Sequence, residues 1–344
     1  MMIKLDTIIV NKSILSQYDS QGMYKIYDGW PEIAKNAFTQ NFDQIEFSNI
    51  DHIVFAGMGG SGAIGDIFSS ILSKTNIHVC VTKGYLLPKT VDENTLVIPS
   101  SVSGNTVETL TILDSAKKLG CKIAAFASGG KMEEYCIKNK IDFTKIPQIH
   151  SPRTSTITYL YSMINILGPI LPIKKNDIDE SITALEKLKN KICSDNLNQN
   201  NPSLELAKWL SGTPIIYYPA GLEASAIRFK NSLQENCKMH VIAEDIIEAC
   251  HNGIVAWETT SNVKPILLKG KDDYIKTKER WKFVQEYFHK NKIDYKEIET
   301  TSGHILTKII CLIYLLDYAS IYKSVISKTD PSPVNSINFI KDRI

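Results

Sequence analysis

The chain has 344 residues, enough at roughly 100–200 residues per domain for two domains, and its 43% hydrophobic and 22% charged residues are typical of an ordinary globular protein. Its 39 Lys and Arg residues nearly match its 37 Asp and Glu residues, so it lacks the basic field that holds a nucleic-acid backbone, and nucleic acid is excluded as a main partner. The seven scattered cysteines contain no Cys-x-x-Cys pair, which argues against a disulfide framework or zinc cluster and for a reducing, cytosolic compartment.

The N-terminal segment is not expected to be a secretory signal, because residues 1–15 carry charges within the apolar run and lack a small-residue cleavage site. Residues 1–50 are expected to form a mainly helical leader that packs against the first domain. The longest uncharged stretch, residues 157–173, contains glycine and proline and is shorter than the roughly 20 residues of a membrane helix. It predicts a buried helix, and no membrane is expected as a partner.

The first domain, residues 51–190, alternates short β-branched segments with longer amphipathic ones. This alternation indicates crossover units and a parallel sheet covered on both faces, so the predicted fold class is α/β, doubly wound. Strands are predicted at 53–56, 78–81, 95–100 and 122–127, and helices at 63–72, 106–119 and 132–138.

A polar stretch, residues 174–201, separates this block from a second domain, residues 200–344, in which the alternation resumes. The segments IVFAGMGGSGAIGDIF at 53–68 and IIYYPAGLEASAIRF at 215–229 share a strand, a glycine turn and a small-residue helix start, which suggests two similar domains. In this second domain, strands are predicted at 214–221, 263–270 and 295–298, and helices at 224–236, 277–289 and 306–322.

A glycine loop, GMGGSG at residues 57–62, follows the first strand and opens a helix. Its G-x-G-x-x-G spacing is used by dinucleotide-binding folds to bring backbone amides up to a pyrophosphate. Such folds also need an acidic residue at the end of the second strand, where this chain has Val81-Thr82-Lys83. Because Lys83 could suit a 2′-phosphate, a nicotinamide-dependent oxidoreductase stays open as an alternative.

A second polar loop, SVSGNT at residues 101–106, places three hydroxyls and a glycine just before a helix, with Glu108 three residues after Asn105 as in a capping arrangement. Helix N-termini present unpaired amides and a positive dipole end, and short hydroxyl side chains add donors without bulk. The two loops together predict a cradle for one phosphate monoester. Ordinary helix capping is the competing interpretation of the second loop.

Several segments resemble known families. GMGGSG, SVSGNT, SGGK at 128–131 and Pro152-Arg153 resemble the sugar isomerase (SIS) domain. RFKNSLQENCK at 228–238, HNGIVAWE at 251–258 and DPSPVNSINFIK at 330–341 resemble the bifunctional phosphoglucose/phosphomannose isomerases of archaea and some bacteria. The resemblance implies two SIS domains, a homodimer, and interconversion of aldose and ketose 6-phosphates without a metal or other cofactor.

The resemblance also implies roles for individual residues. Arg153 matches the arginine near the reacting carbons, Glu235 the base, His251 the ring-opening histidine that reaches the site from the neighbouring subunit, and Lys341 a lysine of the C-terminal helix. The residues implied in phosphate binding are Gly60, Ser61, Ser101, Ser103 and Thr106.

The chemistry of the reaction agrees with these residue types. One carboxylate, Glu235, could move a proton between C1 and C2 through a cis-enediol. A fixed guanidinium at Arg153 would stabilise the enediolate, and an imidazole, the side chain of His251, is a residue type suited to the proton transfers of ring opening. The expected substrates are glucose 6-phosphate and fructose 6-phosphate, with mannose 6-phosphate as a further one.

Two departures from the family pattern lie close to these residues. Gly253 stands where an acidic residue is expected, and Thr154-Ser155-Thr156 stands where small apolar residues are usual. Both changes could alter which sugar is accepted. An isomerase for another, modified phosphosugar and a non-catalytic sugar-phosphate-binding protein therefore stay open as alternatives.

Overall fold

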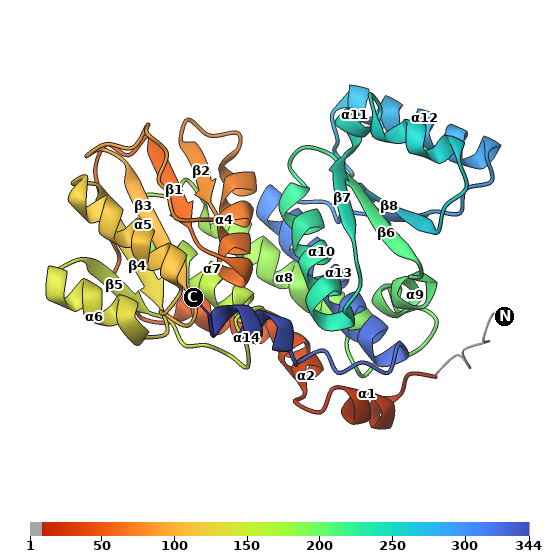
Figure 1. Ribbon diagram of the computed structural model, residues 1–344, viewed down its shortest axis with the longest axis horizontal. Helices are drawn as coiled ribbons and strands as arrows, with labels where there is room; N and C mark the ends of the chain where they lie inside the picture. Colours follow the sequence, from red (N-terminus) through yellow and green to blue (C-terminus); the bar gives the residue numbers. More distant parts are fainter. Residues whose placement is uncertain (1–8, 344) are drawn as a thin grey trace. The chain divides into compact units, whose positions relative to one another are not determined.

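The computed structural model describes residues 9–343, which form two compact units (Figure 1). The first unit comprises residues 29–182, and the second comprises residues 183–343 together with residues 9–28. Each unit is built around one sheet in which all paired strands run parallel.

The first unit has a five-stranded sheet in the order β2-β1-β3-β4-β5. Apolar side chains of α5 and α6, among them Ile112 and Met132, pack on Val54 and Val97 of one face, and Phe68 of α4 stacks on Phe55 of the other. The strands are β1 (His52–Ala56), β2 (His78–Thr82), β3 (Leu96–Ser101), β4 (Lys122–Ala127) and β5 (Asp142–Lys145), and the helices are α3 (Trp30–Thr39), α4 (Gly59–Leu72), α5 (Val107–Lys118), α6 (Gly130–Asn139) and α7 (Thr156–Ile166).

The second unit repeats this plan with a four-stranded sheet in the order β7-β6-β8-β9. Helices α9, α10 and α13 cover one face through residues such as Phe229 and Leu312, and α11 and α12 cover the other through Ile246 and Trp281. The elements are α9 (Pro202–Trp209), β6 (Thr213–Tyr218), α10 (Glu223–Cys237), β7 (Ile242–Asp245), α11 (Ile246–Ala249), a 3₁₀ helix η1 (Gly253–Glu258), β8 (Val263–Lys269), α12 (Ile275–Lys290), β9 (Lys296–Glu299), α13 (Ile305–Ile326) and α14 (Asn335–Lys341).

The shared strand order confirms the predicted class, two doubly wound α/β domains. The buried helix predicted over 157–173 is α7, which ends earlier, at Ile166, because Gly168 and Pro169 follow. The sequence prediction missed the short strands β5 and β7, since four residues are too few to show a clear periodicity.

The helices of the predicted leader divide between the two units, which differs from the prediction. Helices α1 (Lys12–Tyr18) and α2 (Met23–Asp28) belong to the second unit and pack on α13, whereas α3 packs on α7 of the first unit. The expectation that residues 1–50 pack on the first domain is therefore wrong for residues 9–28; residues 1–8 lie outside the described part. The aromatic side chains of α2 decide this, because Tyr27 and Tyr318 pack edge to face in the core of the second unit.

The boundary between the units also differs from the predicted limits of 190 and 200. It falls at residues 182 and 183, within the predicted polar stretch but inside the continuous helix α8 (Lys175–Ile192). Over residues 175–192 the polarity of this stretch reflects an amphipathic helix rather than a linker.

The longest helix, α13, is apolar around its whole circumference, as expected for a helix that other elements surround. It is long and apolar enough to cross a membrane, but 83% of its most apolar window is buried in the protein. Helices α1, α2, α9 and α10 pack around it, so α13 is the central core helix of the second unit.

A buried ion pair joins α10 to α13. Arg228 donates to Asp317 at 3.0 Å through Nε and at 2.9 Å through Nη2, and the two residues are 3% and 0% exposed. Ser232 and Tyr27 also donate to the Asp317 carboxylate, at 2.6 and 3.1 Å. Burial opposes the charge on Arg228, but the Asp317 carboxylate outweighs it and raises the pKa of the guanidinium. The network holds α2, α10 and α13 in one register.

Replacing Asp317 by Asn should leave the buried Arg228 charge without its counter-ion. We expect the free energy of unfolding, measured by urea denaturation, to fall by about 3–5 kcal/mol. Asp195→Asn is the control, because Asp195 pairs with Lys12 on the exposed surface and its loss should leave the urea midpoint unchanged. Equal midpoints for the two variants would contradict a structural role for the buried pair.

Candidate active site

Three helices of the first unit begin at the same edge of the sheet. Helices α4, α5 and α6 follow β1, β3 and β4 directly, and their N-cap residues Met58, Thr106 and Gly129 make no side-chain capping hydrogen bond. Strands β1 and β3 are neighbours although β2 lies between them in the chain, so a topological switch point falls between their loops. Backbone amides and dipole ends at such a point favour an anionic ligand.

The start of α6 holds the second polar loop in place. The Met132 amide donates to the Gly104 carbonyl at 2.9 Å, and the Lys131 amide donates to Asn105 Oδ1 at 3.0 Å. Gly104 has φ +69°, and a Cβ there would lie 1.7 Å from the Gly129 carbonyl oxygen. Because α6 contributes its amides to this loop, the N-termini of α4 and α5 are the ones that can face a phosphate.

The predicted phosphate-binding hydroxyls meet at these two helix starts. Ser61 Oγ accepts from the Val102 amide at 3.2 Å, which links the loop after β1 to the loop after β3. Ser101 and Thr106 share a hydrogen bond of 2.9 Å between their hydroxyls. Ser103, on the same loop, is exposed, and its hydroxyl accepts a hydrogen bond from the Asn105 amide.

The capping arrangement predicted from Asn105 and Glu108 is wrong. The N-cap of α5 is Thr106, and the Asn105 side chain bonds instead to Lys131 and to the Ser103 carbonyl. The long-range contact with α6 competes successfully with the local cap, which leaves the start of α5 without a side-chain acceptor.

Arg153 lies beside the start of α4. A Cβ at Gly60 would lie 3.0 Å from the Pro152 carbonyl oxygen and 3.3 Å from Arg153 Cα, so the absence of a side chain at Gly60 favours this close approach of the two segments. Arg153 is 5% exposed. The structure therefore brings Gly60, Ser61 and Arg153 together within one unit.

The unusual hydroxyls after Arg153 belong to its turn. Thr154 donates to the Ile149 carbonyl at 2.6 Å, Ser155 to Ser151 at 2.9 Å and Thr156 to Arg153 at 3.0 Å. All three hydroxyl residues are fully buried. They brace the backbone that presents Arg153, which gives this departure a structural role.

Two lysines that flank the predicted phosphate loops are already paired. Lys83 Nζ lies 2.6 Å from Asp66, and Lys145 Nζ lies 3.0 Å from Glu133. The pairing of Lys83 speaks against its use for a 2′-phosphate, and with it against the nicotinamide alternative.

Glu235, His251 and Lys341 all belong to the second unit. Glu235 is half-buried in the last turn of α10, Lys341 is exposed at the end of α14, and His251 is exposed just after α11. The His251 amide donates to the Glu248 carbonyl at 2.8 Å, which fixes the backbone of this loop.

A carboxylate from another element occupies the space beside Gly253. A Cβ at Gly253 would lie 2.6 Å from both carboxylate oxygens of Glu244 on β7. Burial, together with Glu248 and Asp245, raises the pKa of Glu244. Sequence reasoning missed Glu244 because nothing in the local pattern shows which carboxylate packs against this glycine.

Glu235 and His251 of one chain lie at opposite edges of the second sheet. Helix α10 runs back from the carboxyl end of β6, and its 15 residues span about 22 Å, so Glu235 lies toward the amino edge. β7 then returns to the carboxyl edge, where α11 and His251 follow. One chain therefore does not bring these two side chains into one site.

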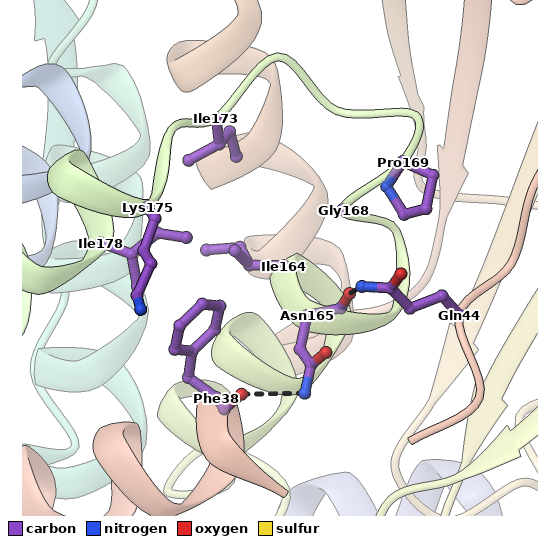
Figure 2. A pocket seen from close by; sticks show the side chains of 9 residues that line it. All are labelled: Phe38, Gln44, Ile164, Asn165, Gly168, Pro169, Ile173, Lys175 and Ile178. Atoms are coloured by element: carbon purple, nitrogen blue, oxygen red, sulfur yellow. Dashed lines mark hydrogen bonds between the residues drawn. The ribbon is translucent and has the colours of Figure 1, made fainter. Parts of the chain in front are cut away.

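A pocket of about 400 Å³ lies elsewhere in the first unit (Figure 2). Asn165, near the end of α7, bridges its rim by donating to the Phe38 carbonyl at 2.8 Å. Since Arg153 lies just before the start of α7, this pocket is at the far end of that helix from the candidate site. The lining residues are Phe38, Gln44, Ile164, Asn165, Gly168, Pro169, Ile173, Lys175 and Ile178.

Both units match described families. Residues 46–168 match the SIS domain, and residues 199–344 match the bacterial phospho-glucose isomerase C-terminal SIS domain. A solved structure described as a glucose-6-phosphate isomerase like protein from Thermus thermophilus has the same fold, with a TM-score of 0.67 at 13% identity and 100% coverage of both chains. Fold and site thus define a two-domain protein of the SIS class.

Curated relatives identify the family within the SIS class to which the chain is similar. Proteins named bifunctional phosphoglucose/phosphomannose isomerase are 31% identical over 91% of this chain and 94% of the relative in Caldicellulosiruptor bescii, and 32% identical over 89% and 93% in Thermoplasma acidophilum. The chain belongs to the bifunctional phosphoglucose/phosphomannose isomerase family, which confirms the resemblance seen in its motifs.

The tight crossing at Gly104 can be tested with a matched pair of variants. Gly104→Ala adds a Cβ that clashes with the Gly129 carbonyl at positive φ, whereas Gly120→Ala adds one at φ +73° with no atom within 4 Å. Backbone strain alone should cost Gly120→Ala about 1–2 kcal/mol of unfolding free energy. Gly104→Ala should lose more, and fructose 6-phosphate should no longer raise its melting temperature. A normal ligand-induced shift in Gly104→Ala would argue against this loop as the phosphate site.

Proposed function

We propose that the protein is an aldose–ketose isomerase that interconverts glucose 6-phosphate and fructose 6-phosphate and also accepts mannose 6-phosphate. Family membership supports the reaction class. The observation that carries the site is the meeting of two uncapped helix N-termini, those of α4 and α5, with the buried Arg153 in one unit. That arrangement suits a substrate with one phosphate group and a reactive carbon chain beside it.

In this proposal the phosphate is bound without a dedicated lysine. The first-turn amides of α4 and α5 supply partial positive charge, and the hydroxyls of Ser61, Ser101, Ser103 and Thr106 add donors, with Gly60 allowing close approach. Because Lys83 and Lys145 are paired with carboxylates, they would add little net charge at the loop. The arginine is thereby reserved for the reacting end of the sugar.

The proposed chemistry moves protons and leaves the overall oxidation state of the sugar unchanged. The Glu235 carboxylate takes the C2 proton of the open-chain aldose, and the C–H electron pair forms the C1=C2 double bond. The C1=O π pair moves to O1, which takes up a proton to give a cis-enediol; this proton is balanced by the one that O2 releases in the next step. O2 then loses its proton, and the carboxyl proton returns to C1 to give the ketose. The planar enediol has lost the C2 stereocentre, so glucose and mannose 6-phosphates share it.

Arg153 would stabilise the negative charge that develops on O1 and O2. A guanidinium stays protonated at all relevant pH values and presents several donors in a fixed plane. The braced turn at residues 154–156 holds it in advance of the reaction, which is the condition for electrostatic stabilisation of a transition state.

The site would be completed in a homodimer. Since His251 lies at the opposite sheet edge from Glu235 of its own chain, the imidazole that opens the sugar ring at Glu235 would come from His251 of the partner subunit. Lys341, close to the C-terminus, would assist at the ring oxygen. No metal or cofactor is part of this proposal.

A cytosolic location fits the cysteines. All seven cysteines lie within the described residues, and none of them forms a disulfide. Cysteines that form no disulfide are usual in a reducing compartment.

The proposal is tested by following glucose 6-phosphate formation from fructose 6-phosphate, and separately fructose 6-phosphate formation from mannose 6-phosphate, with a chelator present. Turnover of both supports the bifunctional isomerase. Turnover of neither, with fructose 6-phosphate binding measured by calorimetry, would favour a sugar-phosphate-binding protein or an isomerase of a modified phosphosugar.

The proposed role of Glu235 as the general base can be tested with Glu235→Gln. This substitution keeps the shape of the side chain and removes the base. We expect kcat for fructose 6-phosphate to fall by about 10²–10⁴-fold. Glu223→Gln, at the exposed start of the same helix, is the matched control and should retain wild-type turnover. Near-normal kcat in Glu235→Gln would remove this residue from the mechanism.

The shared site predicts complementation between two inactive variants. Glu235→Gln and His251→Asn chains, unfolded together and refolded, should form mixed dimers in which one of the two sites is intact. With random pairing, about a quarter of the wild-type activity should return. If each chain supplied both residues of its own site, every site would carry one defect, and mixing would restore nothing.

A further inference from the structure

Lys238 joins two segments of the second unit that carry proposed catalytic residues. It follows α10 directly, three residues after Glu235, and belongs to the QENCK motif, in which it has no assigned role. Its backbone is left-handed, with φ +57°, a conformation that turns the chain sharply away from the helix end.

The Lys238 ammonium lies among backbone carbonyl oxygens from two places in the chain. It donates to the Glu235 carbonyl at 2.5 Å, and to the carbonyls of Pro333 and Asp330 at 2.8 and 3.3 Å. The Pro331 carbonyl is 3.5 Å away. A lysine near a helix C-terminus commonly binds the last carbonyls of its own helix, but here the other partners are 92 to 95 residues away in sequence.

The partner segment, residues 330–333, is well suited to act as a fixed anchor. Pro331 and Pro333 restrict φ, so the directions of the neighbouring carbonyls are largely preset. Asp330 is held in turn, since its carboxylate accepts from Ser20 at 2.7 Å and from the Ser332 amide at 2.8 Å. Helix α14, which ends at Lys341, begins two residues after this segment.

We propose that Lys238 is a positioning residue that sets the placement of Glu235 relative to Lys341. The ammonium links the last turn of α10 to the segment that precedes α14. The positions of Glu235 and Lys341 therefore both depend on the contacts of this one ammonium. The inference rests on the proposed function. A base that must serve both C1 and C2 tolerates little displacement, because an error of about 1 Å can cost roughly 10²-fold in rate.

The test variant is Lys238→Gly, because glycine adopts the left-handed backbone without strain while it removes the ammonium together with its aliphatic chain. Lys292→Gly is the matched control, since Lys292 has φ +55° just after α12 in the same unit. Lys238→Arg should restore part of the function, since a guanidinium also donates to carbonyls.

We expect Lys238→Gly to lower kcat for fructose 6-phosphate by about ten- to a hundredfold. KM should stay within about twofold of the wild type, since the proposed phosphate contacts lie in the first unit. Amide hydrogen exchange in residues 335–341 should become faster in Lys238→Gly and stay unchanged in Lys292→Gly. The melting temperatures of all variants, measured in parallel, separate this effect from general unfolding.

Unchanged kcat or unchanged exchange of α14 in Lys238→Gly overturns the inference, as does an equal loss in Lys292→Gly. Glu235→Gln is assayed alongside. If wild-type protein isomerises and Glu235→Gln does not, but Lys238→Gly is fully active, Lys238 alone loses its role. If wild-type protein itself does not isomerise the sugar phosphates, the proposed function fails, and the catalytic role of Lys238 fails with it.

Discussion

The direction of the strands is the constraint on which the rest of the structure depends. In each sheet all paired strands run parallel, so the loops that follow them meet at one edge and the helices return to the other. In the first unit this brings the loops after β1 and β3 together at a switch point and aligns two helix N-termini. In the second unit it separates Glu235 from His251, and the proposal that His251 acts at Glu235 of a partner subunit rests on this separation.

Most of the polar groups around the candidate site support other groups. Asn105 is held by α6, Arg153 by a turn of buried hydroxyls, and α10 by the Asp317 network. Such supports matter because a side chain contributes to catalysis only when its position is set before the substrate arrives. Lys238 extends this arrangement from side chains to the relative placement of two helices.

The distribution of charge agrees with the proposal that neutral donors bind the phosphate and Arg153 stabilises the enediolate. In the proposal, dipoles and hydroxyls face the phosphate, and two flanking lysines, Lys83 and Lys145, are paired with Asp66 and Glu133. A phosphate held mainly by neutral donors would not compete with the enediolate for the buried Arg153. The strongest electrostatic effect would thereby act at the carbons where charge appears during the reaction.

The sequence alone was sufficient for the fold class, the two similar domains, the buried helix α7 and the loops at 57–62 and 101–106, because periodicity, glycine turns and hydroxyl clusters act over a few residues. It did not show that residues 9–28 join the second unit, that Asn105 leaves its local cap, or that Glu244 fills the space beside Gly253. These outcomes depend on contacts between segments far apart in the chain. Packing in three dimensions selected them, since each local pattern was compatible with more than one partner.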